Sequence, residues 1–397
     1  MIVAALMLVL SVVLLLWPFL FYPLVLNRLP ERPVMRAMRG EGLPSATLVF
    51  CAYNEAAALP EKIANLRGLK ARYPALEILA FNDGSADGTA ALLDGAADIL
   101  TPLHGPGRAG KAQGMKTLVA RARGDVVIFT DANVMLDMEA VERLLTYYAD
   151  PLIGGVLGSL VYDGAGASSS AQVGGLYWRI EEGLKDRESR TGNVMGADGS
   201  IFSIRRDLYP DFPDSVLDDL VVSMSVVFAG RRLIKAKDVV AREMMVAKRE
   251  DEMRRKVRIA ARSWHTHRYL RPQLVRMAGI DRFKYASRKI VRWFGAVWMV
   301  TGALSALVLA WHWAPMGAIG LLLLGCGLLS MGYGKRTGVL ASLTDIVLAY
   351  AATLQGIVLA VRGRDFTLWA PAKSRSKDMA GQDGAGRKDR IGGGPDA

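Results

Sequence analysis

The stretch Val126-Val127-Ile128-Phe129-Thr130-Asp131-Ala132-Asn133 is an apolar run that ends in a carboxylate and, two residues later, a carboxamide. Consecutive apolar residues, mostly β-branched or aromatic, are typical of a buried strand in a parallel sheet. Ligands of open α/β sheets bind beyond the carboxyl ends of such strands. Side chains two apart in an extended segment point the same way, so Asp131 and Asn133 can face one cation or one diphosphate.

Earlier segments show the same pattern of an apolar strand followed by polar groups. Residues 47–52 lead into Tyr53 and Glu55, residues 77–81 lead into Asp83, and residues 99–103 form a third expected strand. Stretches with apolar residues at helical spacing separate them, which predicts an α/β fold with a mostly parallel sheet. Polar groups then collect at one edge of that sheet, which suits a nucleotide and its phosphates.

A glycine-rich run from Gly105 to Lys111 matches G-x-G-x-x-G and also the first seven positions of a P-loop. Ala112 stands where a P-loop needs Ser or Thr, and the run follows the third expected strand instead of the first. Both motif interpretations are therefore disfavoured. Lys111 is still expected to meet a phosphate, as a flexible cation in a glycine-rich loop.

Two adjacent carboxylates, Asp218 and Asp219, precede an apolar helical stretch. Two interpretations stay open for them. Carboxylates near a helix start often only stabilise the unpaired N–H groups of the first turn. Alternatively the pair is catalytic, because one carboxylate raises the pKa of its neighbour, as a general base requires.

The composition predicts that part of the chain lies in lipid. With 397 residues, 51% of them apolar, and a mean hydropathy of +0.21, the chain is too apolar for a wholly soluble protein. Residues 1–26 carry no charged side chain and are expected to be a retained transmembrane anchor. Residues 291–361 are expected to hold two to three membrane helices, with a break at Pro315. The last apolar segment, 339–361, either crosses the membrane or is re-entrant.

Basic residues predict how the chain is oriented and where it binds. Their excess, within a formal net charge of +12, is concentrated between Arg231 and Arg292, without a nucleic-acid-binding motif. A membrane surface is therefore favoured over nucleic acid as partner, and the central region is expected to be cytoplasmic. Residues 246–290 are expected to form a basic amphipathic interfacial region, and residues 362–397 a disordered basic tail.

Six short motifs occur in a fixed order along the chain. They are Ala52-Tyr53-Asn54-Glu55, Asn82-Asp83-Gly84-Ser85-Ala86-Asp87-Gly88-Thr89, Gly110-Lys111-Ala112, Thr130-Asp131-Ala132-Asn133, Gly196-Ala197-Asp198-Gly199 and Asp218-Asp219. In this order, over roughly residues 47–293, the chain resembles the family 2 glycosyltransferases, membrane-anchored enzymes of the processive-synthase type. The resemblance implies a GT-A fold, with a Rossmann-like, mostly parallel sheet, in a cytoplasmic domain of residues 27–245. Transmembrane helices would flank this domain at a bacterial inner membrane.

The resemblance also implies a reaction, the inverting transfer of a sugar from a nucleotide-sugar donor, expected to be a UDP-sugar. The acceptor would be lipid-linked or a polysaccharide. By position, Tyr53, Glu55 and Asp83 would hold the base and ribose of the donor. Asp131 and Asn133 would occupy the D-x-D site, which binds Mg²⁺ or Mn²⁺ and the diphosphate. Asp219 would be the general base.

On the acceptor side, the resemblance implies roles for Asp198, Asp218 and Arg258. The Q-x-x-R-W motif of processive synthases is replaced here by residues 255–259, which carry Ile259 in place of Trp. The loss of that ring removes a stacking partner for a sugar. A processive exopolysaccharide synthase therefore stays the alternative within this class. A catalytically inert membrane scaffold that keeps the nucleotide fold is the alternative of another class.

Overall fold

The computed structural model describes residues 1–38, 42–163, 169–244, 249–335, 337–364 and 366. Its centre is a sheet of eight strands in the order β3-β2-β1-β4-β7-β6-β8-β5. The strands are β1 (Ala46–Ala52), β2 (Glu77–Asn82), β3 (Thr101–His104), β4 (Val126–Thr130), β5 (Val134–Leu136), β6 (Ile153–Asp163), β7 (Ile201–Arg205) and β8 (Arg232–Met244).

The sheet confirms the predicted α/β class. Strands β3, β2, β1 and β4 run parallel, as expected, and β6 pairs in parallel with β8. Strand β7 is antiparallel to both β4 and β6, and β5 is antiparallel to β8. The strand expected at residues 99–103 instead spans Thr101–His104, so its predicted start was wrong by two residues.

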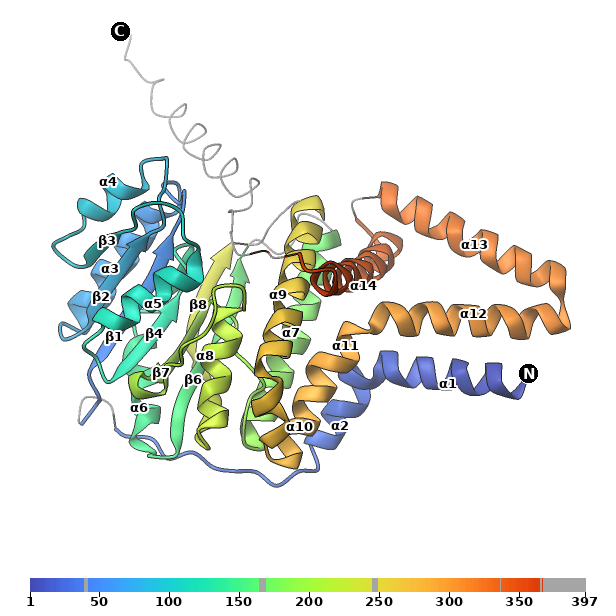
Figure 1. The fold of residues 1–397 in the computed structure, drawn as a ribbon, viewed down its shortest axis with the longest axis horizontal. Coiled ribbons are helices and arrows are strands. Elements are labelled where there is room, and N and C mark those ends of the chain that lie inside the picture. Colours follow the sequence, from blue (N-terminus) through green and yellow to red (C-terminus); the bar gives the residue numbers. More distant parts are fainter. Residues whose placement is uncertain (39–41, 164–168, 245–248, 336, 365, 367–397) are drawn as a thin grey trace, which may run out of the picture.

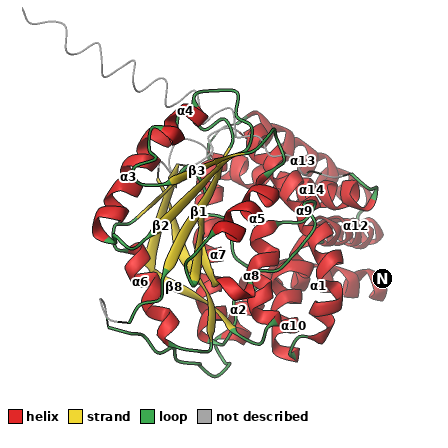
Figure 2. Ribbon diagram, turned by 60° about the vertical axis from the view of Figure 1, so that its left-hand side comes forward, coloured by secondary structure: helices red, strands yellow, loops and turns green. Residues whose placement is uncertain are grey.

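Helices cover both faces of the sheet because the strands are apolar on both sides. Along β4, Val126 and Ile128 pack in one core, and Val127 and Phe129 pack in the other. Figure 2 shows α3 and α6 on one side of the sheet and α5 and α8 on the other. On the first side lie α3 (Leu59–Arg72), α4 (Thr89–Asp94), α6 (Ala140–Thr146) and η2 (Tyr147–Ala149); on the second lie α5 (Lys111–Arg121), η3 (Arg206–Leu208) and α8 (Asp218–Phe228).

A helical layer joins the sheet to the apolar helices, and Figure 1 shows it between α8 and α12. Its members are η1 (Trp17–Phe21), α2 (Tyr22–Leu26), α7 (Ser169–Arg190), α9 (Arg249–Arg276), α10 (Gly279–Tyr285), η4 (Ala286–Ile290) and α11 (Val291–Trp293). The helix expected in the basic region therefore exists as α9. The expected boundary at residues 245 and 246 lies outside the described residues.

Four helical segments are long and apolar enough to cross a membrane: Ile2–Leu26, which begins with α1 (Ile2–Leu16), then α12 (Gly295–Trp313), α13 (Pro315–Gly334) and α14 (Val339–Val361). Pro315 separates α12 from α13, as predicted. In Figure 1, α1, α12 and α13 project to one side, whereas α14 is seen end-on beside α9. The tail expected at residues 362–397 lies outside the described residues, apart from 362–364 and 366.

Helix α14 packs on the sheet-bearing part of the chain more closely than the other apolar helices do. About a third of the most apolar 18-residue stretch of α14 is buried inside the protein, compared with 11–17% of the corresponding stretch in each of the other three segments. Gly356 allows this approach, because a Cβ there would lie 2.3 Å from the carbonyl oxygen of Val257 on α9. Near its start, the buried Asp345 pairs with Arg249 at 2.6 Å.

Candidate active site at the carboxyl edge of the sheet

Five predicted site residues follow strand ends or begin a helix at one edge of the sheet. Tyr53 and Glu55 follow β1, Asp83 follows β2, Asp131 follows β4, and Lys111 opens α5. Because β2, β1 and β4 are parallel neighbours, their carboxyl ends lie side by side. The edge predicted from the sequence therefore exists.

Hydrogen bonds join the loops after β1 and β2. The backbone N–H of Asn54 donates to Ser85 Oγ at 3.0 Å, and the N–H of Glu55 donates to Thr89 Oγ1 at 2.9 Å. In return, Asn54 Oδ1 accepts from the N–H of Ala86 at 2.9 Å. Asn54 adopts a positive φ of 53°, which Asn tolerates better than most residues. These bonds fix Tyr53 and Glu55 beside the loop that carries Asp83.

Asp83 holds the glycine-rich loop in place. Its carboxylate accepts from the backbone N–H of Ala109 at 2.7 Å and of Gly110 at 2.9 Å. The loop also places the guanidinium of Arg108 4.0 Å from the ring centre of Tyr53, a stacked cation–π contact. An aromatic ring, a buried carboxylate and a loop of backbone donors thus surround one position, an arrangement suited to a nucleotide.

Lys111 links the two carboxylate positions of the site. Its Nζ lies 2.7 Å from Asp131 and 3.9 Å from Asp218. Burial alone would lower the pKa of Lys111, but Asp131, Asp218 and Asp219 raise it above its ordinary value. Gly199 lies against this pair, because a Cβ there would lie 3.0 Å from Lys111 Nζ and 3.3 Å from Asp131. The loop 196–199 therefore lies directly on the Lys111–Asp131 pair.

Asp218 and Asp219 begin α8, and the structure assigns them different surroundings. Asp218 is buried, with Lys111 and Arg262 each 3.9 Å away. Asp219 is half-buried and accepts from the N–H of Leu220 at 2.7 Å. Burial, together with the charge of Asp218, raises the pKa of Asp219 to about 6. Asp219 therefore both accepts a hydrogen bond at the start of the helix and has a raised pKa. A carboxylate with this pKa is suited to accept a proton near neutral pH.

The predicted cation site contains one partly exposed carboxylate, that of Asp131, and one carboxamide, that of Asn133. Asp131 is partly exposed, whereas Asn133 donates through Nδ2 to Glu243 on β8 at 3.0 Å, so only its carbonyl oxygen can face a cation. Among the described residues, no three His, Cys, Asp or Glu side chains group closely enough to hold a metal ion. Mg²⁺ commonly uses one or two protein carboxylates together with substrate phosphates. The residues present fit a cation of that kind, completed by a diphosphate.

The predicted acceptor-side residues differ in their contacts. Asp198 pairs with Lys185 and accepts from Ser200. Burial would raise the pKa of Asp198, but Lys185 brings it below its ordinary value. Arg258 is half-buried and bonds to none of the described residues, and burial and then Arg262 lower its pKa to about 10. Asp198 therefore anchors its loop, while Arg258 is available to a ligand.

Two cations near the site were missed from the sequence. Arg262 is buried, donates to the carbonyl oxygen of Val216 and faces Asp218. Its spacing of four residues from Arg258 places both on one face of α9, and this pattern could have indicated it. Lys62 is fully buried in α3 and donates to the carbonyl oxygen of Val134 at 2.5 Å, beside the turn that carries Asp131. No local pattern pointed to Lys62.

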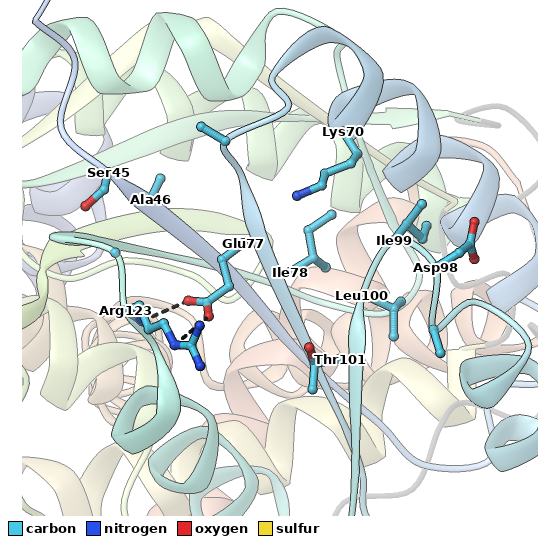
Figure 3. Close-up of a pocket in the computed structure, with 13 residues that line it drawn as sticks. Ser45, Ala46, Lys70, Glu77, Ile78, Asp98, Ile99, Leu100, Thr101 and Arg123 are labelled. Atoms are coloured by element: carbon cyan, nitrogen blue, oxygen red, sulfur yellow. Dashed lines mark hydrogen bonds and ion pairs between the residues drawn. The ribbon is translucent and has the colours of Figure 1, made fainter.

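A surface hollow lies at the opposite end of the strands, and Figure 3 shows the residues that line it. Ser45, Glu77 and Thr101 lie at or just before the first residues of β1, β2 and β3. Glu77 accepts from the backbone N–H of Arg123 at 2.8 Å, which ties two of the lining residues together. The site residues described above follow the carboxyl ends of β1, β2 and β4, so this hollow is separate from them.

Comparison with known proteins agrees with this geometry. Residues 47–212 match the family described as Glycosyl transferase family 2. The poly-beta-1,6-N-acetyl-D-glucosamine synthase of Staphylococcus aureus is 28% identical over 222 residues, covering 52% of this chain and 50% of that protein. An N-acetylglucosaminyltransferase of Rhizobium leguminosarum bv. trifolii is 26% identical over 124 residues, covering 30% of this chain and 68% of that protein. The chain thus spans about half the length of the staphylococcal relative.

A solved structure extends the likeness of fold beyond the family match. A mannosyltransferase from Pyrobaculum calidifontis, solved with GDP-Man and Mn²⁺, superposes with a TM-score of 0.70 at 20% identity. The match covers 90% of this chain and 99% of that one. Residues 47–212 thus match the family 2 glycosyltransferases, and the chain has the GT-A fold. Asp218, Asp219 and Arg258 lie beyond the residues that match the family, so their roles rest on their geometry.

Proposed function

We propose that this chain is an inverting glycosyltransferase that transfers a sugar from a UDP-sugar to a lipid-linked or polysaccharide acceptor. The observation that supports this most is Asp219, a half-buried carboxylate with a pKa of about 6 at the start of α8. Lys111 joins the neighbouring Asp218 to Asp131 on the other side of the site. A base and a diphosphate site thus adjoin, as direct transfer requires.

Each residue has a task in this proposal. Tyr53, Glu55 and Asp83 bind the nucleoside, Lys111 contacts the diphosphate, and Arg258 lies on the acceptor side. Asp219 takes the proton of the attacking acceptor hydroxyl as the bond from the anomeric carbon to the diphosphate breaks. Inversion follows because this is a single displacement, with the hydroxyl attacking opposite the leaving group.

Asp131 and the carbonyl oxygen of Asn133 would hold Mg²⁺ or Mn²⁺, with diphosphate oxygens completing the coordination. When bound, the cation would neutralise the charge that develops on the departing diphosphate. Binding of this cation requires Lys111 to share Asp131 or move away from it, since Nζ lies at 2.7 Å. The likeness to a fold solved with Mn²⁺ agrees with this proposal.

The test is nucleoside diphosphate release by membranes that contain the protein, with UDP-GlcNAc, other UDP-sugars and GDP-mannose as donors. We expect release with one UDP-sugar only when Mg²⁺ or Mn²⁺ is present, and loss of release on chelation. The inert-scaffold hypothesis predicts no release with any donor. Product length on a gel separates single transfer from the alternative, processive synthesis of an exopolysaccharide.

We also propose a topology in which the central domain is cytoplasmic at the inner membrane. Segment Ile2–Leu26, α12 and α13 would cross the membrane, while α14 would lie along its cytoplasmic surface against α9. The support is that α14 is the most buried of the apolar helices and lies end-on in the view in which α1 and α12 lie lengthwise. A non-crossing α14 keeps Arg362 and Arg364 cytoplasmic, as the positive-inside rule favours.

A cysteine placed at Arg364 tests this topology, with a membrane-impermeant thiol reagent applied to intact cells and to inverted vesicles. We expect labelling only in inverted vesicles. Labelling in intact cells would mean that α14 crosses the membrane.

A further inference from the structure

A charged cluster lies where the membrane helices meet the domain, on α7, η4 and α11. Arg288 is buried and pairs with Glu181 and with Glu188, the latter at 2.6 Å. Arg292 pairs with Glu181 at 2.7 Å and also donates to Tyr177. These two carboxylates are thus matched by two guanidinium groups.

Lys289 lies between these two arginines in the sequence, but no carboxylate pairs with its ammonium group. Its side chain is half-buried, and it makes no hydrogen bond or ion pair with any residue in the described part of the chain. Its Nζ lies 3.9 Å from the point where a Cβ on Gly196 would be, so Lys289 and Gly196 are neighbours. Gly196 has a φ of +99°, and a Cβ there would lie 2.5 Å from Leu220, so this position suits glycine.

The loop 196–199 has one glycine toward each side. Gly199 faces Lys111 and Asp131, the donor side, whereas Gly196 faces Lys289 and Leu220, the residue after Asp219. The N–H of Ala197 donates to Ser223 of α8 at 2.9 Å, which fixes the loop on the helix that begins with Asp218 and Asp219. Lys289 therefore lies near Asp219 but across the loop from the donor side.

An unmatched, half-buried ammonium is costly unless an anion joins it. Burial, and then the charges of Arg288 and Arg292, lower the pKa of Lys289 to about 8, although Glu181 and Asp219 oppose this shift. By contrast, Lys111 has carboxylate partners and a raised pKa. Like Arg258, which also bonds to none of the described residues, Lys289 thus gains from binding an anion.

The position of Lys289 indicates where that anion comes from. It lies on η4, six residues before α12 begins at Gly295. The same cluster reaches the first apolar segment, because Tyr22 donates to Glu188 at 2.7 Å. Figure 1 shows α2, α10 and α11 meeting at this junction. Phosphate is the compact anion of lipid head groups, and lysine binds it as a point charge.

We propose that Lys289 binds the phosphate of a lipid-linked acceptor, so that the acceptor enters from the membrane side of the loop 196–199. This inference rests on the proposed glycosyl transfer and specifies its acceptor class as a lipid phosphate that carries a sugar. The phosphate pairs with the ammonium group of Lys289, while a hydroxyl of the acceptor sugar reaches Asp219. The bonds made and broken in the transfer are unchanged.

The test uses the 397-residue chain in nanodiscs of phosphatidylcholine. It is titrated with dodecyl phosphate and, separately, with dodecanol, the corresponding alcohol without the phosphate. Tryptophan fluorescence reports binding, because Trp293 lies next to η4. We expect dodecyl phosphate to bind and dodecanol not to bind at the same concentrations. Lys289→Met should weaken the binding of dodecyl phosphate about tenfold or more, the effect of losing a charge-assisted hydrogen bond. Lys289→Arg should retain it.

The matched control is Lys237→Met, which removes an exposed lysine that pairs with Asp186 and with neither Glu181 nor Glu188, and it should leave binding unchanged. In wild type, binding should weaken above pH 8 as Lys289 loses its proton, and this loss should be absent in Lys289→Arg. Equal affinity of wild type and Lys289→Met would overturn the proposal. Equal competition by inorganic phosphate would overturn its lipid part.

Diphosphate release in the absence of acceptor separates this inference from the proposed function. We expect Lys289→Met to leave the KM for the donor unchanged. A raised donor KM would assign Lys289 to the donor site and overturn the inference. If no donor is turned over at all, the proposed function fails, while the dodecyl phosphate titration still tests Lys289.

Discussion

Two regions of this protein gather charged side chains but are built in different ways. The proposed donor edge is formed by Tyr53, Glu55, Asp83, Lys111 and Asp131, and the proposed membrane junction by Glu181, Glu188, Arg288 and Arg292. At the donor edge, Asp83 and Asp131 follow parallel strands, and hydrogen bonds between neighbouring loops hold the site together. At the junction, Arg288 pairs with Glu188 across 100 positions of sequence. The donor edge is thus set by the sheet, whereas the junction depends on how separate helices dock.

The largest effect is expected at Asp219. Asp219→Asn removes the proposed base while keeping the shape of the side chain, so transfer should fall by about 10²–10⁴-fold. Donor binding, measured by UDP titration, should be retained. Asp207→Asn, an exposed carboxylate on η3, is the control and should be fully active. Transfer by Asp219→Asn at the wild-type rate would exclude Asp219 as the base.

The junction should show the largest loss of stability. Glu188→Gln removes a fully buried charge that accepts from Arg288, Tyr22 and the N–H of Met195. Breaking a buried pair in this way costs about 3–5 kcal/mol. The control Glu31→Gln breaks an exposed pair with Arg190, which costs at most about 1 kcal/mol. Thermal unfolding in detergent measures both, and similar shifts for the two variants would contradict a docking role for the buried cluster.

The donor edge should be sensitive to a single methyl group in its loop. Gly84 has a φ of +66°, and a Cβ there would lie 2.8 Å from the backbone of Gly107. Gly84→Ala should cost about 1–2 kcal/mol, because a side chain disfavours this conformation. If this cost falls entirely on the donor-bound state, where the strain would displace the glycine-rich loop, the donor KM rises by about 5–30-fold.

Gly107→Ala is the control in the same loop, because a Cβ at Gly107 would meet nothing within 4 Å. It should leave the donor KM unchanged. Equal donor KM values for Gly84→Ala and Gly107→Ala would show that the loop does not need this close approach.

The smallest effect is expected at Asn133. Asn133→Asp adds a negative charge to the proposed cation site, so Mn²⁺ should bind more tightly in the presence of UDP. The gain should be only about threefold, since the new carboxylate would face Glu243, which now accepts from Asn133 at 3.0 Å. Calorimetric titration measures it, and an unchanged affinity would mean that this side chain is not a ligand.

The sequence predicted the position of these polar residues at the carboxyl edge of the sheet well, because the physical rule behind that position is local. A buried strand followed by a polar residue places that residue at the sheet edge, and this held for Tyr53, Asp83 and Asp131. The start of β3 was misplaced because Ile99 and Leu100 are apolar but precede the paired residues. Apolarity marks burial, whereas pairing sets the ends of a strand.

The junction could not be predicted in the same way. Arg288, Lys289 and Arg292 were expected only as positive charge before a membrane segment. The partners of Arg288 and Arg292 on α7 are 100 and 111 positions away, and no local pattern connects them. The spacing of Arg262 from Arg258 indicates a shared helix face, but its contact with Asp218 depends on α9 packing against α8. Such contacts require the tertiary structure.

The pH dependence of kcat/KM in wild type and in Asp218→Asn tests the central claim most directly. Asp219 must be deprotonated to act as a base, so kcat/KM for the donor should rise with pH up to about 6 and then level off below about pH 8. The charge of Asp218 contributes to the raised pKa, so its removal should move this acid limb to lower pH, whatever the remaining rate. An acid limb at the same pH in both proteins would contradict the assignment of Asp219 as the base.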